Sequence, residues 1–535
     1  MSAYLKINDS DNVAVALENL APNSIIETDG NSLQIKEMIP QKHKFALKAF
    51  APGDALYMYG VLVGEATKKI DKGGLISLKN TKHKTKKVVG KTAEWHWSAP
   101  DVSRWKEKTF MGYHRKDGQV GTENIWLFFP LVFCENRNIQ TLKKIFDKII
   151  HPTPPDPLEE LLHDLVSEPQ AKGQIQRQQQ QQSPFENVSV RFLTHQGGCG
   201  GTREDAQSLA ALLAGYVNNP NVAGATVLSL GCQNLEISIF KKALEKNKTA
   251  KPLLIFDQQS EGTTEQFLKH IIEASVEEIK KADTTTRQPA PLSKLTIGLE
   301  CGGSDGFSGI TANPALGYVS DQMAALGGKA ILAEFPELSG VEQELVNRCS
   351  SKEDGEKFLT LMHSYERTAQ EAGSGFDMNP SPGNIKDGLI TDAMKSAGAA
   401  KKAGNAPVAS VLDYTEYATA AGISLLCTPG NDVESTTALA GSGANLILFT
   451  TGLGTPTGNP ITPVVKVGSN SALIEHMPDI IDFDCGTMIS KKHSLESVGE
   501  ALLEHIIAVA SGEIQTKATL LQQHDFIPWK RGVSL

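Results

Sequence analysis

The chain has 535 residues, of which 40% are hydrophobic and 21% charged, and its formal net charge is −9. This length exceeds what one ordinary hydrophobic core needs, so we expect two or three domains in a soluble globular protein. The acidic balance argues against nucleic-acid binding. The longest apolar stretch, 125–134, is about half of a membrane span, and the start lacks a signal peptide, so we expect no membrane association.

The first ninety residues predict a small all-β module. Turn residues at 29–31 and 51–54 separate short segments of strand-like composition. These segments are 13–17, 24–27, 32–35, 45–49 and 56–59. A lysine-rich stretch and a tryptophan-containing segment follow, and we predict a linker over residues 91–109.

Residues 110–291 are expected to form a second domain that contains the apolar run 125–134. A low-complexity insertion at 152–186 interrupts it, with a proline-rich start and a run of glutamines at 178–182. Such composition is typical of a solvated loop, so we assign it no function.

From residue 187 onward, short apolar runs alternate with longer helical segments. The runs are 188–193, 225–230, 253–256, 295–299, 330–333, 423–426 and 446–449. This alternation predicts an α/β body in two parts with mostly parallel sheets, and residues 292–535 form the C-terminal Rossmann-like domain. Because ligands of such sheets bind beyond the carboxyl ends of the strands, the residues that follow these runs are the candidates for a site.

Three cysteines stand in glycine-rich turns after such runs, namely Cys199, Cys232 and Cys301. If the strands are neighbours, three thiolates could hold an iron ion with open positions or a corner-vacant iron–sulfur cluster. The alternative is that each is a small buried hydrophobic residue. Cys134 could join this group. Seven cysteines without regular spacing argue against a disulfide framework and favour a reducing, cytoplasmic location.

Two histidines are candidates for proton transfer. His43 lies between two lysines in the β module, and His195 lies four residues before Cys199. An imidazole can act as base, acid or metal ligand near neutral pH. The alternatives are an exposed histidine on a basic turn for His43 and a histidine bonded to a backbone carbonyl for His195.

Oxygen-bearing side chains cluster around the turn 300–314. Ser304, Asp305 and Asn313 could orient a polyol or complete a coordination sphere. Glu300 and Glu334 could perform acid–base chemistry or cap helices.

Three further residues are candidate substrate ligands. Arg115 could pair with a substrate carboxylate. Thr455 and Thr457 could donate hydrogen bonds from the glycine-rich segment 450–458. That segment is not expected to bind a dinucleotide, because Pro456 interrupts it and no ribose-binding acid follows at the required distance.

Six motifs together resemble the altronate/galactarate dehydratase family over nearly the whole chain. They are HKFAL (43–47), GQVGTEN (118–124), LGCQN (230–234), ECGGSDGFSGITANP (300–314), NPSPGN (379–384) and TTGLGTPTG (450–458). The segment 300–314 is specific to that family, and the opening residues 4–17 resemble its altronate branch. The resemblance implies that residues 1–90 form a β-clip domain of the SAF type.

The resemblance also implies a function. It predicts a hydro-lyase that dehydrates D-altronate to 2-dehydro-3-deoxy-D-gluconate in galacturonate catabolism, with Fe²⁺ as Lewis acid and either Mn²⁺ or an iron–sulfur cluster as the alternative. Cys199, Cys232 and Cys301 would lie near the metal. Galactarate dehydration and non-catalytic sugar-acid binding are the competing functions, and a homodimer is consistent with the resemblance.

Overall fold

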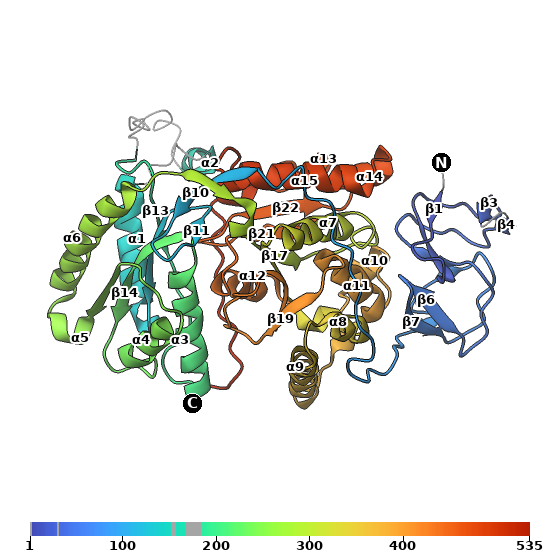
Figure 1. Cartoon of the computed structure of the whole chain (residues 1–535), viewed down its shortest axis with the longest axis horizontal. Coiled ribbons are helices and arrows are strands. Elements are labelled where there is room, and N and C mark those ends of the chain that lie inside the picture. The colour runs from blue at the N-terminus through green and yellow to red at the C-terminus, as the bar shows by residue number, and fades with distance from the viewer. Residues whose placement is uncertain (1–2, 29–30, 151–156, 167–182, 535) are drawn as a thin grey trace. The chain divides into compact units, whose positions relative to one another are not determined.

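The computed structural model describes residues 3–28, 31–150, 157–166 and 183–534 (Figure 1). The glutamine run at 178–182 lies outside them. The chain forms two compact units. Unit 1 comprises residues 1–123, 211–221 and 287–531, and unit 2 comprises residues 124–210, 222–286 and 532–535. We describe each unit by itself.

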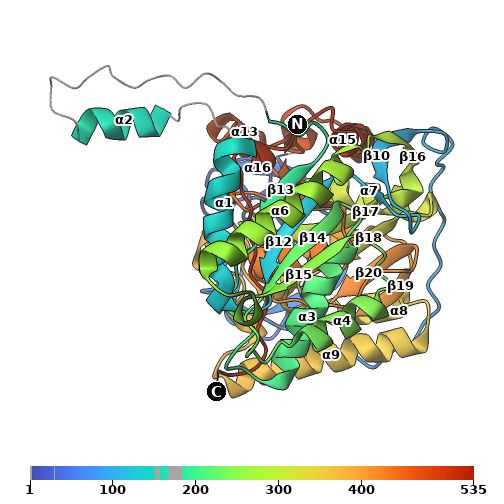
Figure 2. The same ribbon diagram turned by 90° about the vertical axis from the view of Figure 1, so that its left-hand side faces the viewer.

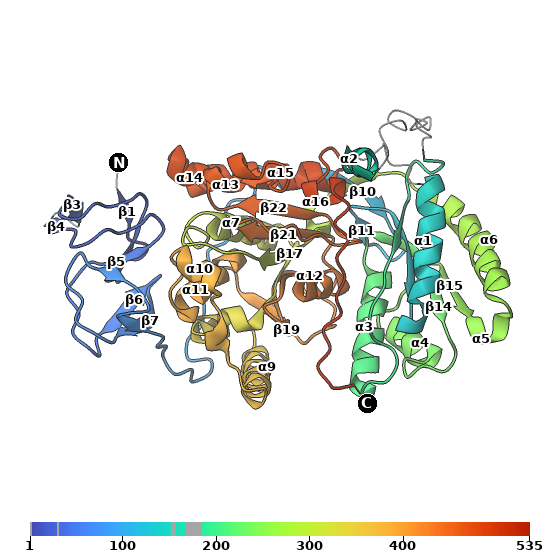
Figure 3. The ribbon, with the colours of Figure 1, turned by 180° about the vertical axis from the view of Figure 1, so that it is seen from behind.

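Unit 1 begins with a small all-β module (Figure 3). Its described strands are β1 (Tyr4–Leu5), β2 (Val13–Ala16), β3 (Ile25–Thr28), β4 (Asn31–Gln34), β5 (Lys44–Ala46), β6 (Ala55–Met58), β7 (Val61–Ala66), β8 (Leu75–Ile76) and β9 (Thr81–Lys82). They form three small sheets, ordered β1-β2-β5-β8, β3-β4 and β6-β7-β9. The predicted all-β module is confirmed. Four of the five predicted strands lie within one residue of their observed ends, and β5 ends three residues early.

The range predicted as a linker has no regular secondary structure before Thr109, where β10 begins, yet it is held against the rest of unit 1. The Lys91 ammonium donates to the Cys349 carbonyl at 2.7 Å, and Trp95 Nε1 donates to the Asn405 carbonyl at 2.8 Å. Trp105 is 1% exposed within the large core of the unit. We call residues 85–108 the strap. It leads into β10 (Thr109–His114), which pairs with β11 (Val120–Gly121) and β16 (Gln288–Pro291).

The main sheet of unit 1 has seven strands, and all its strand pairs are parallel. Their order is β19 (Val408–Leu412), β20 (Gly422–Leu426), β18 (Lys329–Leu332), β17 (Thr296–Cys301), β21 (Leu446–Thr451), β22 (Val464–Gly468) and β23 (Phe483–Asp484). Every residue of β17 and β21 is buried, as expected for strands covered on both faces. Strands β18, β19 and β20 lie on one side of β17, and the later strands β21, β22 and β23 lie on its other side. The strand order therefore reverses between β17 and β21, which makes this place a topological switch point.

Helices and 3₁₀ turns connect these strands. They are η2 (Leu292–Lys294), α7 (Ala312–Ala325), η3 (Phe335–Leu338), α8 (Glu342–Arg348), α9 (Lys352–Glu371), η4 (Phe376–Met378), α10 (Pro382–Lys386), α11 (Asp392–Ala399), η5 (Ala400–Ala403), α12 (Asp432–Gly441), α13 (Ser471–His476), α14 (Thr487–Ser490), α15 (Leu495–Ala510) and α16 (Lys517–Leu520). Helix α12 packs on β17 and β21, and α11 packs on η3. These contacts bring α11 and α12 to the strands that end in Cys301 and Thr451.

Unit 2 is built on a four-stranded parallel sheet (Figure 2). Its order is β13 (Ser189–Phe192), β12 (Ile125–Pro130), β14 (Val222–Ser229) and β15 (Leu253–Asp257). Its helices are η1 (Phe133–Glu135), α1 (Asn136–Ile150), α2 (Pro157–Val166), the start of α3 (Arg203–Asn218), α4 (Ile237–Lys246), α5 (Gln258–Glu261) and α6 (Thr264–Asp283). Apolar residues of α1 and α6 join those of β12 and β14 in one core, which includes Trp126, Phe146 and Phe267.

The predicted fold class is therefore confirmed: a small all-β module precedes a large α/β body whose two main sheets are parallel. The predicted domain bounds remain a prediction, because the two units are defined by contacts within the folded chain. Among the described residues, no helix is both long and apolar enough to span a membrane.

Candidate active site

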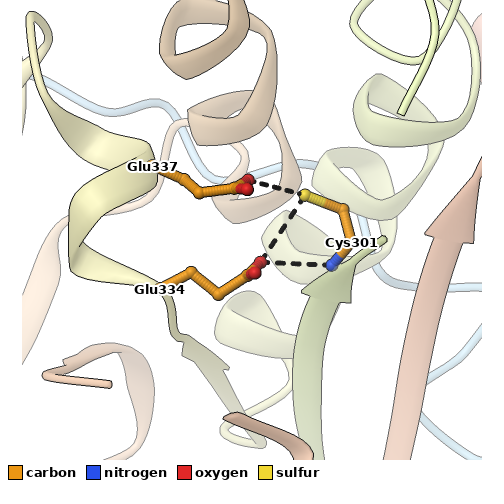
Figure 4. Close-up of side chains that lie close together, drawn as sticks. All are labelled: Cys301, Glu334 and Glu337. Atoms are coloured by element: carbon orange, nitrogen blue, oxygen red, sulfur yellow. Dashed lines mark hydrogen bonds between the residues drawn. The ribbon is translucent and has the colours of Figure 1, made fainter. Parts of the chain in front are cut away.

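A buried cluster of ionisable side chains lies at the carboxyl edge of the seven-stranded sheet (Figure 4). Cys301 ends β17, Glu334 follows β18, and Glu337 lies in η3; none of the three is more than 4% exposed. The Cys301 thiol donates to Glu337 Oε2 at 3.1 Å, and the Cys301 amide donates to Glu334 Oε2 at 3.2 Å. Three elements that are distant in sequence thus meet at one thiol.

The chain reaches this arrangement through an unusual turn after β18. Glu334 has a φ of 68°, in the left-handed region that non-glycine residues rarely adopt. Its amide donates to the Thr428 hydroxyl at 2.8 Å, and the next amide donates to the Thr428 carbonyl. Backbone strain of this kind persists where surrounding contacts fix it, and it is frequent at active sites.

Two lysines supply positive charge to the cluster. Lys402 of η5 is 1% exposed, and its ammonium lies 2.8 Å from Cys301 Sγ and 3.1 Å from Glu334 Oε2. Lys395 of α11 lies 2.5 Å from Glu337 Oε1 and 2.7 Å from Asn379 Oδ1. Buried charges need such partners, because an isolated one is very costly.

Two further carboxyl groups extend the cluster toward α12. The Ser435 hydroxyl donates to Glu300 Oε2, and Glu300, Glu334 and Asp432 each offer an oxygen within 4.8 Å of the others. Both Glu300 Oε1 and Glu334 Oε1 are buried, and neither has a hydrogen-bond partner within the described part of the chain. Unpaired buried oxygens are rare, and a bound cation or water is one explanation for them.

The pKa values of the acidic groups diverge. Burial and the nearby Glu337 carboxylate raise the pKa of the Cys301 thiol well above its usual value. Burial and Glu334 likewise raise the pKa of Glu300, and burial raises the pKa of Glu334 to about 7. Burial would also raise the pKa of Glu337, but Lys395 and Lys402 outweigh it and lower that pKa to about 2. Neighbouring carboxyl groups thus have different protonation states.

Two donor sets bear on metal binding. Cys301 does not fit an iron ligand as it stands, because its thiol donates to Glu337 and the Lys402 ammonium lies against its sulfur. The oxygen set of Glu300, Glu334 and Asp432 is better suited to a hard divalent cation, since it carries the two unpaired oxygens.

The turn after Cys301 contains two of the predicted substrate ligands. Asp305 is fully buried, and its carboxylate accepts from the amides of Phe307 and Ser308, three side chains and an ammonium group. These contacts give it the role of fixing the turn. Ser304 is 4% exposed, and no hydrogen bond of its hydroxyl is found among the described residues, so its role as a substrate ligand stays a prediction.

Three other predicted ligands lie in this region, namely Asn313, Thr455 and Thr457. The Asn313 amide donates to the Gly398 carbonyl and accepts from Thr450, so its side chain is occupied. Thr455 lies beside Gly303, where a Cβ atom would be 3.2 Å from its hydroxyl oxygen. Thr457 is buried, and its carbonyl accepts from the Lys466 ammonium.

His43 lies in a turn of the β module that contacts the body of unit 1 directly. Lys42 Nζ lies 2.9 Å from Asp305 Oδ2, and Lys44 Nζ donates to the Gly388 carbonyl at 2.6 Å. His43 is half-buried, its Nδ1 lies 3.2 Å from the Gln41 carbonyl, and burial lowers its pKa. Burial also lowers the pKa of Lys44 to about 7. Within this turn, burial therefore favours the neutral forms of both His43 and Lys44.

Arg115 has a structural environment. Its guanidinium donates to the carbonyls of Pro220, Glu123 and Asn221 at 2.7 to 3.3 Å. Those bonds tie three backbone segments together within unit 1.

The other predicted residues lie in unit 2. His195 is 4% exposed, its Nε2 lies 2.7 Å from the Pro130 carbonyl, and its Nδ1 accepts from the Gly197 amide. Burial lowers the pKa of His195 to about 4, so its imidazole is neutral at pH 7, and the catalytic role stays a prediction. Cys199 and Cys232 are exposed, whereas Cys301 is buried in unit 1, and the three-cysteine metal site remains a prediction.

Sequence reasoning named Cys301, Glu300 and Glu334 but missed Glu337, Lys395, Lys402 and Asp432. A signal for the lysines existed. The segment 394–404 consists largely of alanine, glycine and serine around Lys395, Lys401 and Lys402, which is the composition of a buried helix. A lysine in such a helix needs an acidic partner.

Comparisons with known proteins agree along the whole chain. Residues 2–84 match the description "Altronate/galactarate dehydratase SAF domain", residues 112–283 match "D-galactarate dehydratase/Altronate hydrolase, second domain", and residues 292–534 match "D-galactarate/Altronate dehydratase, C-terminal". The altronate dehydratase of Bacillus subtilis (strain 168) is 34% identical over 519 residues, covering 96% of each chain. The chain belongs to the altronate/galactarate dehydratase family.

Other relatives support this membership. The altronate dehydratase of Escherichia coli (strain K12) is 32% identical over 99% of this chain and 100% of its own, and the galactarate dehydratase (L-threo-forming) of the same organism is 28% identical over 96% and 94%. As a member of this dehydratase family, the chain is a hydro-lyase that acts on a sugar acid, and its first module is a SAF domain.

Proposed function

We propose that this family member dehydrates D-altronate to 2-dehydro-3-deoxy-D-gluconate in hexuronate (galacturonate) catabolism. The observation that carries the proposal is the cluster of carboxyl groups and two lysines around Cys301, buried beside the switch point of the sheet. The two relatives above 30% identity are both altronate dehydratases, which supports altronate as the substrate.

The proposed chemistry requires three actions on the sugar acid. A base removes the proton beside the carboxylate, a positive charge stabilises the resulting enediolate, and an acid assists the departing β-hydroxyl. Carboxyl groups of differing protonation state supply the acid and base. Lys395 and Lys402 supply charge that is already fixed in place, which is what makes electrostatic stabilisation effective. The Ser304 hydroxyl is a candidate ligand for the polyol.

We also propose that His43 of the SAF domain transfers protons in the reaction. Its turn is held by the Lys42–Asp305 ion pair and the Lys44–Gly388 hydrogen bond, so the imidazole has a defined position against the body. Burial favours its neutral form, which is the form of a base.

Ferrous iron is the proposed cofactor, with Mn²⁺ or an iron–sulfur cluster as the alternative. When bound, such a group would act as a Lewis acid toward a carboxylate or hydroxyl oxygen. Glu300, Glu334 and Asp432 would suit a hard Fe²⁺ or Mn²⁺ ion, whereas thiols would suit a cluster. We further propose a cytoplasmic enzyme that forms a homodimer.

The proposal is tested by an anaerobic assay of the purified chain with ferrous iron and a thiol. D-altronate and galactarate are supplied separately, and formation of a 2-keto-3-deoxy acid is measured. Turnover of altronate with a kcat/KM at least tenfold above that for galactarate supports the proposal. Turnover of galactarate alone would replace the substrate, and binding of either acid without turnover would point to a non-catalytic sugar-acid-binding protein.

A further inference from the structure

Three thiols of unit 2 lie after three neighbouring strands of its parallel sheet. Cys134 follows β12, Cys199 follows β13, and Cys232 follows β14, and the strand order is β13-β12-β14. The carboxyl ends of parallel strands lie at one edge of a sheet, so all three cysteines belong to that edge.

Backbone hydrogen bonds join the three cysteine-bearing turns to one another. The Phe133 amide, next to Cys134, donates to the Gly197 carbonyl at 3.0 Å. The Leu235 amide, three residues after Cys232, donates to the Gly198 carbonyl, next to Cys199, at 3.1 Å. The turn that carries Cys199 is therefore bonded on one side to the turn of Cys134 and on the other to the turn of Cys232.

Glycine is required for this close approach. Gly198 has a φ of +95°, and a Cβ atom there would lie 2.1 Å from the Leu131 carbonyl oxygen. Gly231 has a φ of +110°, and its Cβ would lie 2.7 Å from Gln259 Oε1. An L side chain is strained at both positions because φ is positive there. At Gly198 it would also clash with the main chain that leads to Cys134, so glycine is what allows the turn of Cys199 to approach that of Cys134.

Exposure separates these thiols from the others. Cys134, Cys199 and Cys232 are the exposed cysteines of the chain, whereas Cys301, Cys349, Cys427 and Cys485 are buried. Cysteine is among the residues most often buried, so three exposed thiols at one edge are not explained by packing. Cys232 Sγ accepts from Gln259 Nε2 at 3.4 Å, which shows a polar setting.

Three thiolates suit a soft metal ion or an iron–sulfur cluster. Among the described residues, these three thiols are not one of the groups whose ligand atoms all lie within 4.8 Å of one another, which is the spacing that a single tetrahedral ion requires. An iron–sulfur cluster binds each thiolate at a different iron, which places the sulfur atoms further apart.

We propose that Cys134, Cys199 and Cys232 bind an iron–sulfur cluster through three thiolates and leave one iron without a protein thiolate. Each thiol loses its proton on binding. This ligand set differs from the one predicted from the sequence, because Cys134 replaces Cys301. The Cys301 sulfur contacts Lys402 and Glu337 instead. The inference does not depend on the Fe²⁺ ion of the proposed function, for which Glu300, Glu334 and Asp432 are the suited donors.

The full-length chain is reconstituted anaerobically with ferrous iron, sulfide and dithiothreitol. Bound iron, labile sulfide, visible absorbance and the Mössbauer spectrum are then measured. Cys134→Ser, Cys199→Ser and Cys232→Ser are each expected to lose most of the sulfide and of the visible chromophore. Cys301→Ser and the buried control Cys485→Ala are expected to retain both. Circular dichroism verifies that every variant is folded.

The outcomes separate this inference from the proposed function. A cluster retained by folded Cys134→Ser but lost from Cys301→Ser would overturn the ligand set, and iron bound without sulfide in the wild-type chain would overturn the cluster. The same preparations are assayed on D-altronate. A sulfide-containing chromophore with no turnover would leave the cluster standing and contradict the proposed function.

Discussion

Lys402 is the residue on which the buried cluster depends. Its side chain is 1% exposed, and its ammonium contacts the Cys301 sulfur and the Glu334 carboxylate. Burial would lower its pKa, but the surrounding thiol and carboxyl groups raise that pKa above its usual value, so the lysine stays charged. Lys402 is therefore the cation that compensates the buried Glu334 carboxylate, and removing it would leave that group without its partner.

Lys402→Met tests that dependence. Methionine keeps the apolar stem but leaves Glu334 and Glu337 short of a cation, so we expect the free energy of unfolding to fall by about 3–5 kcal/mol. Activity should fall by roughly a hundredfold or more, because a fixed charge of the site is lost. Urea unfolding and kcat measure the two effects.

A second substitution separates charge from packing. Lys402→Met combined with Glu334→Gln removes both members of the contact, and we expect it to recover part of the lost stability but not the activity. The free energy of unfolding is also measured for Glu334→Gln alone. If the losses of the two single variants add up to the loss of the double variant, the two side chains are not coupled.

His195 predicts a pH dependence of the stability of unit 2. Its pKa falls from the ordinary 6.5 to about 4 on burial, so the unfolded chain takes up a proton at a pH where the folded chain does not. Stability from this residue is complete above pH 6.5 and decreases as the pH falls toward 4, by up to about 3 kcal/mol.

Hydrogen exchange of the β12 and β14 amides at pH 7 and pH 5 measures this effect. His195→Gln, which can still bond to the backbone, should show a weaker loss of protection at pH 5. His270→Gln, a change at an exposed histidine of the same unit, serves as the control. An equal pH dependence in the His195 variant and the wild-type chain would contradict the argument.

Among the structural elements, the turn of residues 40–44 links the SAF domain to the body of unit 1. A Cβ atom at Gly388 would lie 2.4 Å from the Lys42 carbonyl oxygen, and one at Gly306 would lie 2.3 Å from the same atom. Two glycines thus make room for one carbonyl. The contact positions His43 beside the turn that follows Cys301.

Gly388→Ala is expected to displace this turn. The φ of +91° alone costs about 1 kcal/mol with alanine, and the clash with Lys42 adds to it. Gly373→Ala is the matched control, because its φ of +76° is similar and no atom lies within 4 Å of its Cβ. Both variants should lose some thermal stability, but only Gly388→Ala should also lose activity. Equal activity in the two would show that catalysis does not need the position of this turn.

The sequence predicts the strands better than it predicts which side chains from different strands and helices come into contact. Apolar runs such as 295–299 and 446–449 identify β17 and β21, because strands covered on both faces must be apolar throughout. β16 escapes this criterion, since QPAP contains neither an apolar run nor an alternation. Cys301 and Glu334 could be placed at strand ends, but the lysines that pair with them come from α11 and η5. No spacing along the chain reveals that tertiary contact.

At the scale of the whole molecule, the strap is an integral part of the α/β body of unit 1. Its composition resembles that of a linker, yet Trp105 is buried in the large core of the unit, and Trp95 donates to the Asn405 carbonyl. Nearby charges reinforce it, since Lys108 lies 2.6 Å from Glu504 on α15. The strap is therefore expected to unfold with unit 1 and not before it.

Trp105→Ala measures this contribution. Loss of a fully buried tryptophan should lower the free energy of unfolding by about 3–5 kcal/mol. Val89→Ala, at a strap residue that is 68% exposed, should change it by less than about 0.5 kcal/mol. Similar, small effects of the two substitutions would mean that the strap behaves as a free tether.

The contact of one carbonyl with two glycines also has an evolutionary consequence. Gly306 and Gly388 meet the main chain of Lys42, and main-chain atoms are the same whatever side chains a module carries. An exchange of the SAF domain between divergent relatives by recombination therefore requires that the host keeps both glycines and that the incoming turn keeps its backbone course. The incoming turn must also keep the two lysines that bind Asp305 and the Gly388 carbonyl, so both partners of the contact limit such an exchange.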